Sequence, residues 1–200
     1  FSKIKSIHKM NTNFKHIAII PARKNSKSLP YKNRFLFKYT AKFLKEINFF
    51  KKIYVNSDDP NLEVLAKKYN FDFFKRNKKL AKDNTCIKEV FVDMNDKLKF
   101  SSQTFIWLFY IPLVYRNVSD FAKAYKLVES KKLKSICSFV KAKTHPMTCW
   151  YMKKNRPFQF VENDLCRRQD FPEAFSHHHY ICGFNIKYLN KNERKLRKTF

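Results

Sequence analysis

Short apolar runs alternate with amphipathic stretches along most of the chain. Residues 16–21 are an apolar run typical of a buried parallel strand. The next stretch, residues 35–49, predicts a helix whose buried face carries Phe35, Tyr39, Phe43 and Ile47. By the same patterns, further strands are predicted at 52–56, 71–74, 104–110, 135–140 and 180–188, and further helices at 62–69, 86–98 and 120–130. This alternation predicts an α/β fold with a mainly parallel sheet flanked by helices.

Polar residues mark where two of the helices begin. Ser57 or Asp58 can cap the helix at 62–69, with Pro60 near its first turn, and Ser119 and Asp120 supply the cap signal for the helix at 120–130. The pattern loosens between residues 144 and 175, where no regular element is predicted.

Length and composition predict a single folded domain. The chain has 200 residues, of which 44% are hydrophobic and 22 are Phe, enough to bury a sizeable core. Residues 1–9 precede the patterned region and are expected to be an extension, so we expect one domain over residues 10–200. The longest apolar stretch, residues 105–115, is interrupted by Pro112 and is shorter than the roughly 20 residues of a membrane-spanning helix.

The five cysteines give no sign of a disulfide framework or a zinc site. They are odd in number, widely spaced and without a CxxC pair, which predicts reduced thiols and a cytoplasmic protein. Cys149 and Cys182 are expected to be buried hydrophobic residues rather than nucleophiles. The run from His177 to His179 is expected in a loop before the last strand rather than in a metal site, because zinc ligands are normally spaced.

The net charge of +27 favours polyanionic partners of some kind. Lysines occur in nearly every polar segment, and neither a zinc-finger spacing nor an RNP-type signature is present. The aromatic runs at 71–74 and 105–110 fall on predicted strands, where they pack in a core, and the basic stretch at 187–198 reads as a solvated helix or tail. Nucleic acid is therefore not the expected partner, although a basic nucleic-acid-binding protein is kept as an alternative.

A cationic loop follows the first predicted strand. The segment 17–33 reads IAIIPARKNSKSLPYKN and holds Arg23, Lys24, Lys27 and Lys32 close to the end of that strand. Positive side chains and loop amides match phosphate oxygens, and ligands of open parallel sheets bind at the carboxyl ends of the strands. The sequence therefore predicts a polyphosphate site here.

Four ordered blocks resemble a known family. They are IAIIPAR with SK and KN (17–33), YVNSDD (54–59), the Arg-x-x-x-Leu-Ala-x-Asp element (76–83) and RRQDFP (167–172). This order is similar to that of the acylneuraminate cytidylyltransferases, the CMP-sialic acid synthetases. The resemblance implies a Rossmann-like nucleotide-diphospho-sugar transferase fold. It also implies an enzyme that joins CTP to a nonulosonic acid, of sialic, legionaminic or pseudaminic type, and releases pyrophosphate.

The resemblance also implies the site residues and partners. Arg23 and Lys27 would be catalytic, and Arg168, Gln169 and Asp170 would bind the acidic nine-carbon sugar. Mg²⁺ is the implied cofactor, with its ligands unassigned, and a homodimer is implied as well. Asp58 and Asp59 can contact a ribose or a metal, or cap a helix. The nucleotide would be held by Arg23, Asn25, Ser26, Lys27, Lys32, Asn33, Arg76 and Asp83.

Several positions depart from the family pattern. Lys24, Asn25 and Ser28 stand where the family has Gly, which allows a positive φ and close approach of backbone to phosphate. Tyr110 stands where the family has a polar nucleotide contact. The family's acidic Mg²⁺-binding motif is not found, so we expect a C-terminally truncated or divergent member. A catalytically inactive relative that binds nucleotide-sugars is therefore a second alternative.

Overall fold

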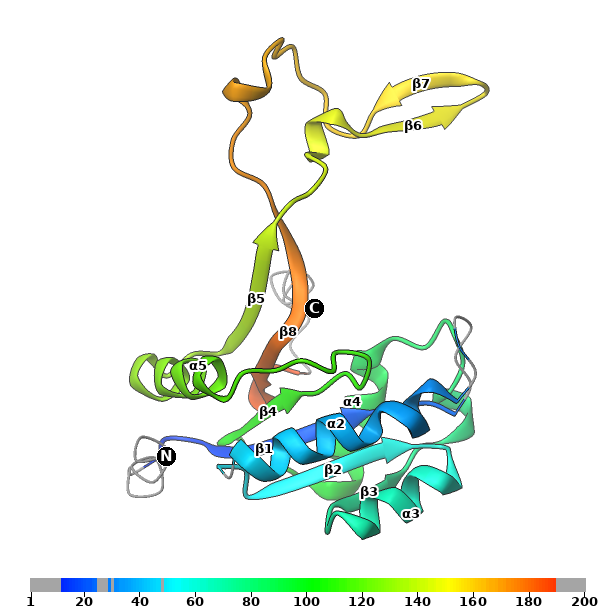
Figure 1. Cartoon of the computed structure of the whole chain (residues 1–200), viewed down its shortest axis with the longest axis vertical. Coiled ribbons are helices and arrows are strands. Elements are labelled where there is room, and N and C mark those ends of the chain that lie inside the picture. The colour runs from blue at the N-terminus through cyan, green and yellow to red at the C-terminus, as the bar shows by residue number, and fades with distance from the viewer. Residues whose placement is uncertain (1–11, 25–28, 30, 48, 190–200) are drawn as a thin grey trace. The chain divides into compact units, whose positions relative to one another are not determined.

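The computed structural model describes residues 12–24, 29, 31–47 and 49–189 (Figure 1). These residues belong to two compact units, one made of residues 1–137 and 179–200 and the other of residues 138–178. The single domain expected over residues 10–200 stays a prediction, and the N-terminal extension lies outside the described residues. Within the described part of the chain, no helix is long and apolar enough to cross a membrane.

A six-stranded sheet, in the order β3-β2-β1-β4-β8-β5, organises the first unit. Strands β1, β2, β3 and β4 are parallel, and β8 runs antiparallel to β4. The mainly parallel α/β fold expected from the sequence is confirmed. The strand bounds are β1 Lys15–Pro21, β2 Lys52–Ser57, β3 Asp72–Lys75, β4 Thr104–Leu108, β5 Ser135–Lys141 and β8 Phe175–Asn185.

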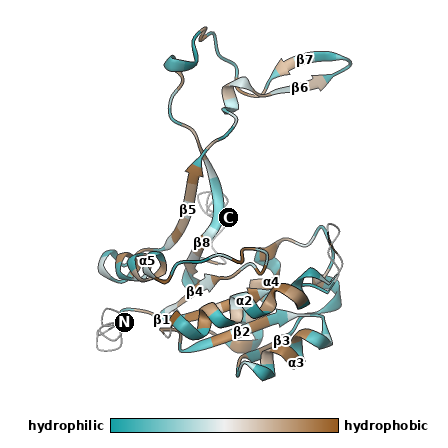
Figure 2. Cartoon of the chain, in the orientation of Figure 1, coloured by the Kyte–Doolittle hydropathy of each residue, from teal (hydrophilic) through white to brown (hydrophobic). Residues whose placement is uncertain are grey.

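Helices cover both faces of this sheet, because alternate residues of each strand point to opposite sides. Ala18 and Ile20 of β1 share one core cluster with residues of α2, α3 and α5, whereas Ile17 and Ile19 share the other with residues of α4. Figure 2 shows apolar residues along these helices and strands. The helix bounds are α2 Lys32–Ile47, α3 Pro60–Lys68, α4 Ile87–Leu98 and α5 Val118–Lys131.

The predicted buried face of α2 is wrong in its first half. Phe35 and Tyr39 are 69% and 45% exposed, whereas Phe37 is fully buried. Phe43 and Ile47 are buried as expected. The buried positions of the helix include Phe37, Thr40, Ala41 and Leu44, so the real stripe starts from Phe37. The two exposed aromatic residues imitate the helical spacing of the core.

The helix caps agree in part with their predictions. Asp59, for which capping was one expected role, caps α3 in place of Ser57 or Asp58 by accepting a hydrogen bond from the Asn61 amide, and Pro60 occupies the first turn as expected. Asn117, rather than Ser119 or Asp120, caps α5 by accepting from the Ser119 amide. Each cap bonds to an amide two positions ahead, so Asn117 lies nearer the loop than the predicted caps of α5, whereas Asp59 lies nearer the helix than Ser57 or Asp58.

The last strand is also longer than predicted. β8 begins at Phe175 and takes in the three histidines, so the loop expected there is wrong. The strand contains Gly183, the single glycine of the chain. A Cβ at this position would lie 2.8 Å from Phe105 and 2.9 Å from the Ile106 carbonyl oxygen, which explains the need for glycine beside β4.

The second unit contains a hairpin that the sequence pattern did not predict. Its strands are β6 Trp150–Lys153 and β7 Arg156–Gln159, which pair in antiparallel register around Lys154 and Asn155. Both turn residues have a positive φ, at 49° and 57°. Short strands without a buried face show no alternation of apolar and polar residues, so periodicity could not reveal them. Two short 3-10 helices, η3 Pro146–Thr148 and η4 Arg168–Asp170, lie in the same unit.

Candidate nucleotide site

The chain leaves β1 directly into a cluster of charged residues. Arg23 Nη1 forms an ion pair with Asp83 Oδ1, and both side chains are partly exposed. Asn33, in the first turn of α2, donates from Nδ2 to the Arg23 carbonyl oxygen at 2.9 Å. Three of the predicted nucleotide-binding residues therefore lie together at the carboxyl end of β1. Their binding role stays a prediction.

A second arginine lies at the carboxyl end of β3. Arg76 is only 7% exposed, and its amide donates to the Ser57 carbonyl oxygen at 2.8 Å. Its Nε donates to Asn56 Oδ1 at 2.5 Å, and its Nη2 donates to the Asn56 carbonyl oxygen at 3.2 Å. The same carbonyl oxygen accepts from the Ala22 amide at 2.9 Å. Asn56 therefore links the chain leaving β1 to the arginine that follows β3.

The charge of Arg76 is influenced by Asp58 and Arg23. Burial is the main reason why the pKa of Arg76 is lowered to about 10; the charge of Asp58 acts to raise this pKa, and the positive charge of Arg23 acts to lower it. A pKa near 10 leaves the guanidinium charged at neutral pH. Two charged guanidinium groups that repel each other at one edge of a sheet are suited to sharing an anion.

The two aspartates after β2 have different surroundings. Asp59 is 1% exposed, and Arg34 donates to it from Nε at 2.7 Å and from Nη2 at 3.0 Å. Burial alone would raise the pKa of Asp59, but the bonds from Arg34 and from the Asn61 amide and side chain, with the charge of Arg34, hold that pKa below its ordinary value. Asp58 is less buried and accepts from the Lys24 amide at 2.7 Å. Asp59 is therefore structural, whereas Asp58 faces the cationic loop.

Other predicted residues are placed less completely. Lys32 is the first residue of α2 and is half-buried. The predicted ligands Asn25, Ser26 and Lys27 lie outside the described residues. The predicted sugar ligands Arg168, Gln169 and Asp170 form η4 in the second unit and are exposed. Asp170 accepts two hydrogen bonds from Arg167, each at 2.9 Å, so its carboxylate is already paired.

The segment after β4 is held by a half-buried arginine. Arg116 donates from Nη2 to the Tyr110 carbonyl oxygen at 2.6 Å and from Nη1 to Thr40 Oγ1 at 3.2 Å. Its guanidinium lies over the rings of Phe43 and Phe109. Burial lowers the pKa of Arg116 to about 10 and raises that of Tyr110 to about 12. These bonds fix the loop, so Arg116 serves the fold at this position.

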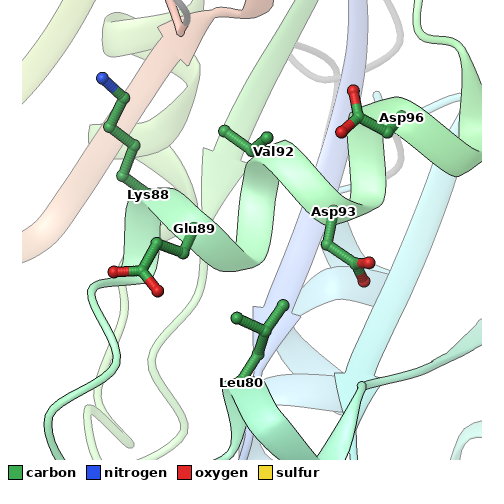
Figure 3. A pocket seen from close by; sticks show the side chains of 6 residues that line it. All are labelled: Leu80, Lys88, Glu89, Val92, Asp93 and Asp96. Carbon is green, nitrogen blue, oxygen red and sulfur yellow. The ribbon is translucent and has the colours of Figure 1, made fainter.

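A separate hollow of about 370 Å³ lies between the short helix η2, Lys78–Leu80, and α4 (Figure 3). Its lining residues are Leu80, Lys88, Glu89, Val92, Asp93 and Asp96. Three of them are carboxylates, which repel a triphosphate. The nucleotide site is therefore better sought among the arginines at the strand ends than in this hollow.

The cysteine expectations hold in part. All five cysteines are free, and Cys182 is 2% exposed. Cys149 is only half-buried, so its expected burial in a core is wrong. The expected core packing of the aromatic runs is confirmed by Phe71, Phe105 and Trp107, which are 6%, 0% and 0% exposed.

Two residues at this edge were missed by sequence reasoning. Asn56 was treated as the end of a strand, and Arg34 was passed over between the predicted ligands and the helix. A polar residue closing the apolar run IYV is a signal that could have drawn attention to Asn56. The pairing of Arg34 with Asp59 joins residues 25 positions apart, so no local pattern reveals it.

Solved structures similar to this chain share its fold. A CMP:2-keto-3-deoxy-manno-octonic acid synthetase in complex with CTP has a TM-score of 0.62 at 14% identity, covering 88% of this chain and 76% of its own. A 4-diphosphocytidyl-2C-methyl-D-erythritol synthase has a TM-score of 0.59 at 10% identity, with coverages of 87% and 76%. The bifunctional IspDF from Campylobacter jejuni has a TM-score of 0.57 at 18% identity, with coverages of 89% and 44%.

Sequence comparison gives the family. A search of curated proteins finds no match. The family model described as cytidylyltransferase matches residues 17–143, well over half of the chain. That range contains both site arginines, strands β2 to β4 and all but the first two residues of β1. The chain therefore belongs to the cytidylyltransferase family.

Proposed function

We propose that this protein condenses CTP with an acidic sugar of the nonulosonic type to give a CMP-sugar and pyrophosphate. The observation that carries the proposal is the placement of Arg23 and Arg76 at the carboxyl ends of β1 and β3, in a chain of the cytidylyltransferase family. The similar fold of a CMP-sugar synthetase in complex with CTP supports it.

The proposed chemistry matches what these side chains offer. A hydroxyl oxygen of the sugar attacks the α-phosphorus of CTP, the bond from that phosphorus to the oxygen bridging to the β-phosphate breaks, and pyrophosphate leaves. The hydroxyl proton passes to solvent. Negative charge grows on the phosphoryl oxygens, so Arg23 and Arg76 stabilise the transition state by position and charge. Lys27 is proposed as a third cation, and Asn25, Ser26, Lys32 and Asn33 as further phosphate donors.

Arg23 is already paired before nucleotide arrives. Its partner Asp83 must give up this contact when phosphate oxygens take the guanidinium. Asp83 is then released toward the nucleotide, where the family resemblance places it. An exposed ion pair is worth about 1 kcal/mol or less, so a triphosphate can displace it.

Mg²⁺ remains a proposed cofactor, and one described carboxylate fits it. Asp59 is held by Arg34 and Asp83 by Arg23, whereas Asp58, among the described residues, accepts through Oδ1 alone, from the Lys24 amide. Protein sites often hold Mg²⁺ through one or two carboxylates together with substrate phosphates. Asp58 would hold the ion, whose bound charge offsets that of the phosphates.

The sugar and the oligomeric state are also proposed. Arg168 and Gln169 are exposed donors suited to a carboxylate and hydroxyl groups, with Asp170 beside them. The second unit also exposes large apolar side chains, among them Trp150, Met152 and Phe160, at 54%, 66% and 66%. Such a surface favours contact with a second copy of the chain. A monomer at micromolar concentration in analytical ultracentrifugation would contradict the homodimer.

Pyrophosphate release tests the proposed reaction. The protein is incubated with CTP, MgCl₂ and a panel of acidic sugars that includes nine-carbon and eight-carbon 2-keto acids. We expect release with at least one sugar, and loss of it in Arg23→Ala. Release with a neutral sugar alone would reassign the substrate, and no release with any sugar would contradict the enzymatic proposal.

A nucleotide-binding relative without turnover is the second candidate. The observation that favours it is that two of the three described aspartates at this edge are occupied by arginines. This candidate predicts binding of CTP or a CMP-sugar with no pyrophosphate release. The same assay, run beside calorimetric titration with CTP, separates the two.

A further inference from the structure

We propose that Asn56 is the positioning residue of the nucleotide site and that its neutral amide keeps Arg76 available to phosphate. This inference rests on the proposed function, because the anion in question is the triphosphate of CTP. It adds a residue that sequence reasoning did not place in the site.

Asn56 is fully buried near the end of β2, which lies between the parallel strands β1 and β3. Its strand neighbours are Pro21 of β1 and Phe74 of β3. It accepts from Arg76 through both its side-chain and its main-chain oxygen. These two bonds fix the direction of the guanidinium, and the bond from the Ala22 amide ties the same residue to the backbone that leads into Arg23.

The donors of Arg76 determine which way the side-chain amide of Asn56 points. A guanidinium has donors and no acceptor, so the amide oxygen of Asn56 must face Arg76. Its Nδ2 group then points away, and it is buried without a hydrogen-bond partner among the residues that the structure describes. An unpaired buried donor costs about 1–3 kcal/mol. Retaining such a group is unfavourable for stability and therefore points to a role in the site.

The third nitrogen of Arg76 is left for a ligand. Among the described residues, none accepts a hydrogen bond from Nη1. This atom is also not one of the described side-chain polar atoms that are fully buried without a hydrogen-bond partner. Nε and Nη2 are engaged with Asn56, so the guanidinium presents one edge outward from a buried position. Phosphate oxygens are suited to that edge.

An aspartate at position 56 would have nearly the same shape as Asn56, but its negative charge would have the opposite effect on phosphate binding. It would put a second carboxylate oxygen in place of the unpaired donor and would pair with Arg76 as a buried ion pair. The pair would hold the arginine in place while cancelling the charge that attracts phosphate. Asn56 therefore supplies position without neutralisation, and Asn56→Asp separates these two properties.

The test is calorimetric titration of the full chain and of Asn56→Asp with CTP, cytidine and inorganic pyrophosphate, together with thermal unfolding. The matched control is Asn185→Asp, which makes the same change at a residue that is 4% exposed. Asn185 pairs with Phe105, near the start of β4, at the opposite edge of the sheet from the site. Its Oδ1 accepts from the Lys187 amide.

We expect Asn56→Asp to stay folded, because its carboxylate pairs with Arg76, and thermal unfolding checks this. Its affinity for CTP and pyrophosphate should fall about ten-fold to a hundred-fold, with little change for cytidine. The control should keep its affinity for all three ligands. Equal affinity of wild type and Asn56→Asp for pyrophosphate would overturn the inference. If wild type bound pyrophosphate but not CTP, the proposed function would fail, while the pyrophosphate comparison would still decide the role of Asn56.

Discussion

At the residue scale, a buried histidine in β1 forms side-chain hydrogen bonds to β4 and α5. His16 is 2% exposed, and its Nδ1 accepts from Trp107 Nε1 at 2.8 Å. Because Nδ1 is an acceptor, the proton lies on Nε2, which donates to Glu129 at 2.6 Å. Burial lowers the pKa of His16, although the bond to Glu129 and its charge act to raise it. The imidazole is therefore neutral at pH 7.

This neutrality predicts how stability depends on pH. The folded pKa lies below the ordinary value of 6.5, so below that pH the unfolded chain binds the proton more readily. The contribution of His16 is therefore present above pH 6.5 and is lost as the pH falls through the folded pKa. Each unit of depression corresponds to about 1.4 kcal/mol.

Thermal unfolding between pH 5 and 8 checks this prediction. The wild type should lose more stability toward pH 5 than His16→Gln, which does not titrate. Parallel profiles for the two proteins would show that His16 makes no pH-dependent contribution.

At the element scale, helix α2 carries two exposed aromatic residues, Phe35 and Tyr39, whose spacing is that of a buried helix face. Phe35 and Phe37 lie two positions apart, on different faces of the helix, with exposures of 69% and 0%. The prediction from spacing chose Phe35, because the pattern Phe35, Tyr39, Phe43 is as regular as the real one. The strand neighbours that settle the choice, such as Ala18 and Val55, are distant in sequence.

Two alanine substitutions test the rotation of α2. Phe37→Ala should lower the free energy of unfolding by about 3–5 kcal/mol, because it opens a cavity in the core. Phe35→Ala should change it by less than about 0.5 kcal/mol, as is usual for an exposed site. Urea denaturation of both variants gives the two values. Similar losses in the two proteins would contradict the observed burial.

At the scale of the whole molecule, the parallel sheet of the first unit could be predicted from the sequence. The hydrogen bonds between buried side chains of the candidate site could not. The apolar run of β1 and the cationic loop after it predicted Arg23 at the strand ends, whereas Asn33, Arg76 and Asp83 were implied by the family resemblance. Asn56 and Arg34 needed the register between strands and the bonds of buried side chains. The hairpin β6–β7 was missed because its exposed strands have no periodic apolar face.

Arg23 and Arg76 are proposed to form the phosphate site of this cytidylyltransferase. Calorimetric titration with CTP tests it in wild type, in a double variant with both arginines changed to alanine, and in Arg156→Ala. Arg156 is an exposed arginine of β7, outside the first unit, and its substitution by alanine removes one positive charge there.

We predict that the wild type and Arg156→Ala bind CTP with similar affinity and that the double variant binds it at least about a hundred-fold more weakly. Equal affinity of the double variant and wild type, or no binding of CTP by wild type, would contradict the account.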